Sequence, residues 1–132
     1  MRVLALDYGA ARTGVAVSDA TGTIALPLEV VERASSPAGL ERIQGMVDEH
    51  GPELVVVGLP LTLRGERGEQ ARRTDEFVRA LREILDVPVE TYDERFTTAL
   101  AARGGAGGAP EDARAAAHLL ESYLAWTSTR PR

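Results

Sequence analysis

The sequence predicts an α/β fold, a mixed five-stranded sheet flanked by helices. Residues 2–7 and 14–18 are strand-like and joined by a short turn, and residues 23–32 alternate apolar and polar side chains. Further strand-like segments at 54–57 and 87–92 are separated from the preceding strand by helix-like stretches. Short connections favour antiparallel pairing, whereas helical crossovers join parallel strands. The predicted sheet therefore has three antiparallel strands followed by two parallel ones.

Length and composition restrict the class of protein. A chain of 132 residues is near the common size of one domain, so we expect a single domain over residues 1–132. The absence of cysteine excludes disulfides and Cys-ligated zinc. No segment is apolar for long enough to span a bilayer, and we expect a cytoplasmic protein with no membrane partner. The net charge of −5 argues against nucleic-acid binding through bulk electrostatics, although a local basic patch can act alone.

Two strands carry informative exceptions to simple alternation. Pro27 lies inside segment 23–32 and cannot donate a ladder hydrogen bond, so this strand is expected at an edge of the sheet or with a bulge. Segment 54–57, Leu-Val-Val-Val, is continuously apolar and bounded by turn residues. Such a run is typical of a central strand that is buried on both faces.

The helices follow from apolar periodicity and from their end signals. Helix-like segments span about 38–50, 69–85, 97–103 and 110–126. Ser36 and Pro37 are typical of a helix start, and Gly51-Pro52 of a helix end. Residues 104–108 are four glycines and an alanine, which predicts a flexible loop.

Acidic residues occur where the predicted elements begin or end. Asp7 ends the first strand, Asp93 and Glu94 end the fifth, and Asp112 lies in the first turn of the last helix. Sites in α/β sheets collect beyond the carboxyl ends of the strands. Clustered carboxylates repel one another unless a cation lies among them, and Mg²⁺ prefers such oxygen ligands. Two such ions about 3.5–4 Å apart can support hydrolysis of a phosphodiester.

Every basic residue of the chain is an arginine, a side chain that can bind phosphate through two parallel hydrogen bonds. Arg12 follows the first strand and is predicted either to contact a phosphate or to form a surface salt bridge, for example with Asp19. Arg64 and Arg67, with Arg72 and Arg73 beyond them, are candidates for a nucleic-acid path; the alternative is a solvated face interleaved with acidic residues.

Four ordered motifs, covering nearly the whole chain, resemble the YqgF family, also called RuvX. That family is similar to the Holliday-junction resolvase RuvC within the RNase H-like superfamily. The motifs are Asp7-Tyr8-Gly9 with Arg12, Gly14, Ala16, Ser18 and Asp19; Val57-Gly58-Leu59-Pro60 with Gly65 and Phe77; Asp93-Glu94-Arg95-Phe96-Thr97-Thr98; and Asp112 with Ala115-Ala116 and Leu119-Leu120-Glu121-Ser122-Tyr123-Leu124.

The resemblance implies an RNase H-like fold and metal-dependent phosphodiester hydrolysis. Asp7, Glu94 and Asp112 would be the catalytic and metal-binding carboxylates, for two Mg²⁺ or Mn²⁺ ions. Because adjacent strand residues point to opposite faces, only one of Asp93 and Glu94 should enter the site, and the resemblance favours Glu94. Family members usually carry lysines just before the last acidic residue, whereas residues 104–110 contain no cation.

Three functions stay open. The first is a nuclease acting on structured RNA, processing the 5′ end of pre-16S rRNA in ribosome biogenesis. The second is a Holliday junction resolvase acting on branched DNA, and the third a non-catalytic nucleic-acid-binding assembly factor. The chain would be a monomer or a homodimer. The segment from Asp7 to Gly14 also resembles the first phosphate loop of the actin and sugar-kinase superfamily, but a second phosphate loop is absent.

Overall fold

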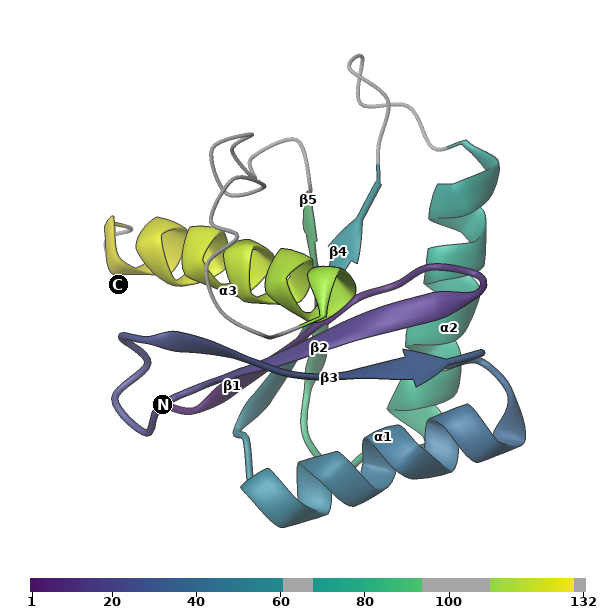
Figure 1. The fold of residues 1–132 in the computed structure, drawn as a ribbon, viewed down its shortest axis with the longest axis horizontal. Helices are drawn as coiled ribbons and strands as arrows, with labels where there is room; N and C mark the ends of the chain where they lie inside the picture. Colours follow the sequence, from purple (N-terminus) through teal and green to yellow (C-terminus); the bar gives the residue numbers. More distant parts are fainter. Residues whose placement is uncertain (61–67, 94–109, 130–132) are drawn as a thin grey trace.

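A computed structural model describes residues 1–60, 68–93 and 110–129 (Figure 1). Five strands form one sheet: β1 (Val3–Asp7), β2 (Arg12–Ser18), β3 (Ala25–Glu32), β4 (Leu54–Leu59) and β5 (Val89–Asp93). Their spatial order is β3-β2-β1-β4-β5. The β1–β2 and β2–β3 pairs are antiparallel, and the β1–β4 and β4–β5 pairs are parallel. The predicted mixed sheet of five strands is therefore confirmed.

Three helices connect or follow these strands: α1 (Pro37–His50), α2 (Glu69–Ile84) and α3 (Glu111–Thr129). The Ser36 side chain accepts a hydrogen bond from the amide of Gly39 and caps α1. Gly51 ends the helix in the left-handed conformation, at φ 62°, as the Gly-Pro pair predicted. The last helix continues three residues beyond the expected end near residue 126.

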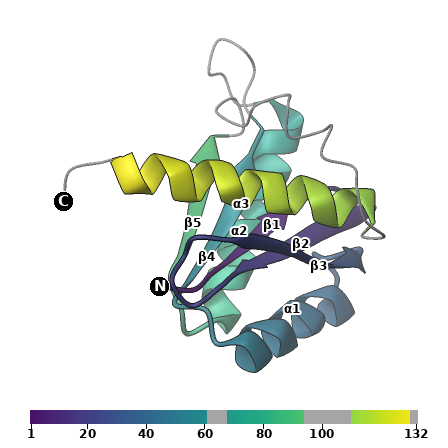
Figure 2. The ribbon, with the colours of Figure 1, turned by 60° about the vertical axis from the view of Figure 1, so that its left-hand side comes forward.

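The sheet separates two apolar cores, because successive side chains of a strand point to opposite faces. On one face, Leu4, Leu6 and further sheet residues pack against α1 and α2. On the other face, Val3, Ala5 and their neighbours pack against α3, which is the one helix on that face among the described residues. Figure 2 shows α3 lying across one side of the sheet, with α1 and α2 on the other side. All six residues of β4 are buried, as expected for a central strand covered on both faces.

Both predictions for the strand with Pro27 are correct. β3 lies at an edge of the sheet, and its register with β2 shifts between Val15 and Ala16, where Pro27 pairs. β2 begins two residues earlier than predicted, because Arg12 and Thr13 pair with Glu32 and Val31 of β3.

Two predicted elements, the helix at 97–103 and the glycine-rich loop at 104–108, lie outside the described residues. Among the helices that the structure describes, none is both long and apolar enough to cross a membrane.

Candidate functional site

The carboxyl ends of three neighbouring strands meet at one edge of the sheet. β1, β4 and β5 are mutually parallel and adjacent, so Asp7 and Asp93 end their strands on the same side. The chain leaves β4 and β5 at this edge into the segments 61–67 and 94–109, which lie outside the described residues. The predicted residues Arg64, Arg67 and Glu94 belong to those segments, so the structure does not test them.

Asp112 is brought to this edge by a close contact between α3 and β2. A Cβ atom on Gly14 would come within 1.8 Å of the carbonyl oxygen of Asp112, so only glycine allows this approach. Gly14 is also the direct partner of Asp7 in the antiparallel β1–β2 pair. Asp112 thereby lies next to the pair of Asp7 and Gly14, although it is about a hundred positions away from them in sequence.

The side chain of Asp7 points to the same side of the sheet as α3. Val3 and Ala5 belong to the core under α3, whereas Leu4 and Leu6 belong to the core under α1 and α2. Asp7 continues the series of Val3 and Ala5, so its carboxylate faces the layer that contains Asp112. The sequence predicted that these two carboxylates share one edge, and the topology brings them to one face as well.

Asp93 falls on the opposite face by the same reasoning. Tyr92 packs in the core under α3, and Glu90 accepts a hydrogen bond from the Tyr123 hydroxyl of α3 at 3.1 Å. Alternation then directs Asp93, like Val89 in the other core, toward the α1 and α2 layer. Asp7 and Asp93 therefore do not share a face of the sheet.

Arg12 forms a surface ion pair, as one of the two predictions for it had it, but its partner is Asp112 and not Asp19. The Arg12 Nε atom lies 3.2 Å from Asp112 Oδ2, and the two side chains are 67% and 39% exposed. Asp19 instead accepts hydrogen bonds from the amides of Thr23 and Ile24 at 2.8 and 3.0 Å and from the Thr21 hydroxyl. These bonds, the one from Ile24 foremost, hold the pKa of Asp19 well below its usual range.

Two of the basic residues considered for a nucleic-acid path are paired within their own helix. Arg72 and Arg73 lie 3.7 and 3.4 Å from carboxylate oxygens of Glu69. All three side chains are more than half exposed, so they fit the alternative of a solvated helix face on which basic and acidic residues are interleaved.

The residues at this edge fit a hard divalent cation. Asp7 and Asp112 supply carboxylate oxygens on one face, the ligands that Mg²⁺ and Mn²⁺ prefer. Within the described ranges 1–60, 68–93 and 110–129, no group of three acidic, histidine or cysteine side chains is close enough to hold a metal. The third predicted ligand, Glu94, is outside those ranges.

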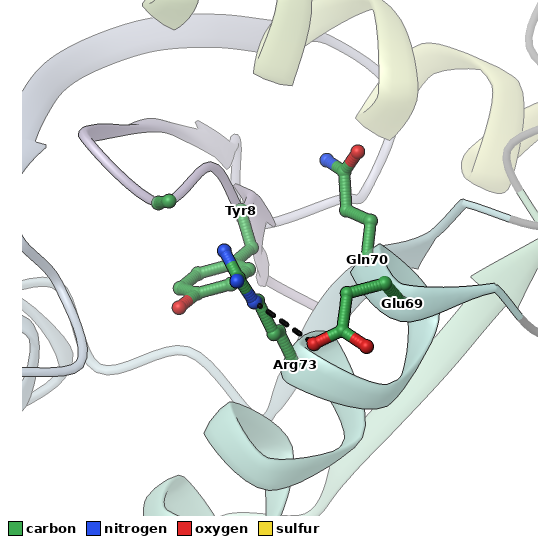
Figure 3. A pocket seen from close by; sticks show the side chains of 5 residues that line it. Tyr8, Glu69, Gln70 and Arg73 are labelled. Carbon is green, nitrogen blue, oxygen red and sulfur yellow. Dashed lines mark ion pairs between the residues drawn. The ribbon is translucent and has the colours of Figure 1, made fainter.

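Sequence reasoning missed a pocket beside the same edge. It has a volume of about 320 Å³ and is lined by Tyr8 and Ala10 of the β1–β2 connection and by Glu69, Gln70 and Arg73 of α2 (Figure 3). The Tyr8 ring stacks on Phe77 of α2, with ring centroids 4.4 Å apart. The sequence contained one indication of this pocket. Because Tyr8 directly follows Asp7, its side chain is expected on the face of the sheet opposite to that of Asp7, which is the face covered by α1 and α2.

The mixed five-stranded sheet, with helices on both faces, defines an RNase H-like fold. The structure resembles that of RuvC from T. thermophilus, solved with a Holliday junction substrate: the TM-score is 0.66 and the identity 20%, over 98% of this chain and 97% of that one. At that identity, the similarity establishes the fold alone.

A family model described as "RuvX: Holliday junction resolvase" matches residues 1–126, and the chain belongs to that family. A relative from Desulforudis audaxviator, named "Putative pre-16S rRNA nuclease", is 48% identical over 99 residues, covering 75% of this chain and 70% of the relative. A protein of the same name from Halothermothrix orenii is 41% identical over 103 residues, covering 78% and 74%. The predicted family and the RNase H-like fold are both confirmed.

Proposed function

We propose that this chain is a nuclease that depends on Mg²⁺ or Mn²⁺ and hydrolyses phosphodiester bonds in structured RNA. The observation that carries the proposal is the contact at Gly14, which places Asp7 and Asp112 on one face of one sheet edge. Carboxylates on one face of one sheet edge repel each other unless positive charge compensates for them. Arg12 supplies such a charge to Asp112, and a divalent cation would supply it to both carboxylates.

Asp7, Glu94 and Asp112 are the proposed metal ligands. Asp93 points to the other face, which supports Glu94 as the residue of that pair that joins Asp7. When bound, divalent ions of this kind activate water and stabilise the charge that develops on a leaving oxygen. Rigid elements hold two of the carboxylates: Asp7 ends a strand whose preceding residues are buried, and Asp112 begins a helix packed on that sheet.

Arg12 is proposed to bind a phosphate beside the metal ligands. Its side chain is 67% exposed, and its Nε atom lies 3.2 Å from Asp112 Oδ2. A guanidinium has five N–H donors in a planar fork, and two of them can reach one phosphate. Arg64 and Arg67, in the segment that leaves β4 at the same edge, are proposed to extend this contact along the nucleic acid.

Pre-16S rRNA is the favoured substrate, because the relatives that share more than 40% of their aligned residues with this chain carry that name. Under this hypothesis, the chain acts in ribosome biogenesis as a cytoplasmic enzyme that processes the 5′ end of the precursor. The second candidate substrate is four-way DNA, which the description of the matching family favours.

The test is cleavage of two labelled substrates, a pre-16S rRNA 5′-leader fragment and a four-way DNA junction, with Mg²⁺ or Mn²⁺. Wild type is compared with Asp7→Asn and with Asp48→Asn. Asp48 is an exposed residue near the end of α1, which leads into the start of β4, so the control makes the same substitution at the other end of the sheet. We expect metal-dependent cutting that Asp7→Asn reduces at least about a thousandfold and Asp48→Asn leaves unchanged, as for loss of a group that binds in the transition state.

Cutting of the RNA alone selects the rRNA-processing role, and symmetric cutting of the junction alone selects the resolvase. Cutting of either substrate that survives Asp7→Asn contradicts the carboxylate site. Binding of nucleic acid without any metal-dependent cutting of either substrate favours the non-catalytic assembly factor over the nuclease.

A further inference from the structure

The pocket beside Tyr8 opens between the β1–β2 connection and the first turn of α2. At about 320 Å³ it is near the lower end of the size range of small-molecule sites, about 300–1,000 Å³. Figure 3 shows Tyr8, Gln70 and Arg73 around the opening, with the ion pair between Glu69 and Arg73 marked. The function proposed above assigns no role to these residues.

The charge of the pocket argues against an anionic ligand. Arg73 is the only cation among the described residues that line it, and its guanidinium lies 3.4 Å from the Glu69 carboxylate. Glu69 also lies in the first turn of α2, where it provides the negative charge that a helix N-terminus favours. A phosphate entering the pocket would meet a carboxylate at close range, so an uncharged polar ligand fits better.

The side chains that line the pocket suit a planar heterocycle. The Tyr8 ring is held in place by stacking on Phe77 at an interplanar angle of 20°. The Arg73 guanidinium offers a flat surface on which a base can stack, and Gln70 carries both a donor and an acceptor on its terminal amide. Unpaired nucleobases are bound by such combinations of stacking surfaces and amide groups.

The pocket also has the correct position relative to the proposed metal ligands. Tyr8 directly follows Asp7, and the two side chains lie on opposite faces of the sheet: Asp7 toward α3, and Tyr8 against the core under α1 and α2. A nucleic-acid backbone passing over the end of β1 would have one phosphate beside Asp7 and a neighbouring base beside Tyr8.

We propose that this pocket, formed by Tyr8, Gln70 and Arg73, binds a single unpaired nucleobase of the substrate next to the bond that is cut. The proposal rests on the proposed nuclease function and specifies its substrate: the nucleic acid must present an unstacked base at that position. Gln70 contributes to the choice of base, because its amide can pair with the edge of a base.

Arg72 and Arg73 provide a matched pair of variants to test the base pocket. Both arginines are exposed, both pair with Glu69, and only Arg73 lines the pocket. Arg72→Ala and Arg73→Ala therefore remove the same charge from the same helix turn. The probes are two RNA hairpins with loops of abasic nucleotides, one of which carries a single 2-aminopurine in the loop; binding to the full chain is measured with Ca²⁺ in place of Mg²⁺.

We expect Arg73→Ala to weaken binding of the 2-aminopurine hairpin about five- to tenfold more than Arg72→Ala does, which is the low end of the range for loss of one stacking partner. The two variants should bind the fully abasic hairpin equally. The 2-aminopurine fluorescence should be quenched by wild type and by Arg72→Ala, and much less by Arg73→Ala. Replacing 2-aminopurine with each natural base should reveal a preference that Gln70→Ala removes.

Equal effects of the two arginine variants on both hairpins would overturn the proposal, and so would failure of wild type to distinguish the hairpins or to bind either of them. These outcomes are separate from the cleavage test. Base-dependent binding without metal-dependent cutting would retain the pocket and reject the nuclease. Cutting that Asp7→Asn abolishes, with no base dependence of binding, would retain the nuclease and reject the pocket.

Discussion

Arg12 and Asp112 form an ion pair, although their proposed roles differ. Arg12 is proposed to bind a phosphate, and Asp112 is proposed to bind the metal. The pair is largely exposed, so its contribution to stability is small, about 0–1 kcal/mol. The position of the ion pair matters more for metal binding than its strength, because Arg12 contacts an oxygen of the carboxylate that would bind the metal. A cation entering the site must compete with the guanidinium for Asp112 Oδ2.

Arg12→Gln should therefore bind Mn²⁺ several-fold more tightly than wild type in the absence of nucleic acid, because a competing positive charge is removed. The same variant should cut its substrate more slowly, because a phosphate contact is lost. Calorimetric titration of the protein with Mn²⁺ measures the first effect. Arg42→Gln is the control: Arg42 pairs with Glu29 on the exposed side of α1, away from the predicted ligands. Unchanged Mn²⁺ affinity in Arg12→Gln would show that the ion pair does not oppose metal binding.

At the scale of helices and strands, the contact between α3 and β2 determines where Asp112 lies. The first turn of α3 reaches Gly14, the strand partner of Asp7, only because Gly14 has no side chain. Ala113, Ala116 and Leu120, all fully buried, then hold α3 along the sheet. At the other end of the helix, Ser122 and the Tyr92 hydroxyl of β5 are hydrogen-bonded at 2.8 Å. One helix thus connects the site to strands on both sides of β1.

Gly14→Ala should move the start of α3 away from the sheet, because the new methyl group would overlap the Asp112 carbonyl. We expect a destabilisation of about 1–3 kcal/mol, typical of inserting an extra carbon into a packed contact, and a large loss of cleavage. Denaturant unfolding and the cleavage assay measure the two effects.

Gly45→Ala is the matched control for that experiment. Gly45 lies within α1, with no atom within 4 Å of the position of a Cβ. Replacing an exposed helical glycine with alanine should stabilise the protein by about 0.5–1 kcal/mol and leave cleavage unchanged. If Gly14→Ala were as stable and as active as Gly45→Ala, the close contact would not determine the position of Asp112.

The described part of the molecule consists of one sheet between two cores, and every strand contributes residues to both cores. The core under α1 and α2 is rich in large aliphatic side chains, whereas the one under α3 uses alanines that let the helix lie close to the sheet. Because β1 and β4 contribute residues to both, loss of either core should remove support from the other. We propose on this basis that residues 1–132 fold as the single domain predicted from length.

Leu81→Ala and Leu120→Ala test that proposal, one in each core. Both side chains are fully buried, and each truncation should cost about 2–5 kcal/mol. If the chain is one domain, each variant should show a single unfolding transition, shifted to lower denaturant, with the same midpoint by circular dichroism and by Trp126 fluorescence. Two separated transitions in either variant would indicate that the two sides of the sheet unfold independently.

Local patterns in the sequence determined most of the fold. The alternation in residues 23–32, the buried run at 54–57 and the end signals at Ser36 and Gly51 each predicted an element that the structure contains. Asp7 at the end of a strand followed from the same patterns, because the periodicity of a strand and the chemistry of a turn act over a few neighbouring residues. The antiparallel-then-parallel order followed from the lengths of the connections.

The tertiary structure alone decided which distant residues meet. Arg12 pairs with Asp112 rather than with Asp19, which is nearer in sequence. The carboxylate oxygens of Asp19 already accept hydrogen bonds from two backbone amides and one hydroxyl. The pocket formed by Tyr8 and α2, and the face to which Asp93 points, likewise depend on how helices cover the sheet. Such contacts arise from the docking of complete elements, and no local periodicity records which surfaces will meet.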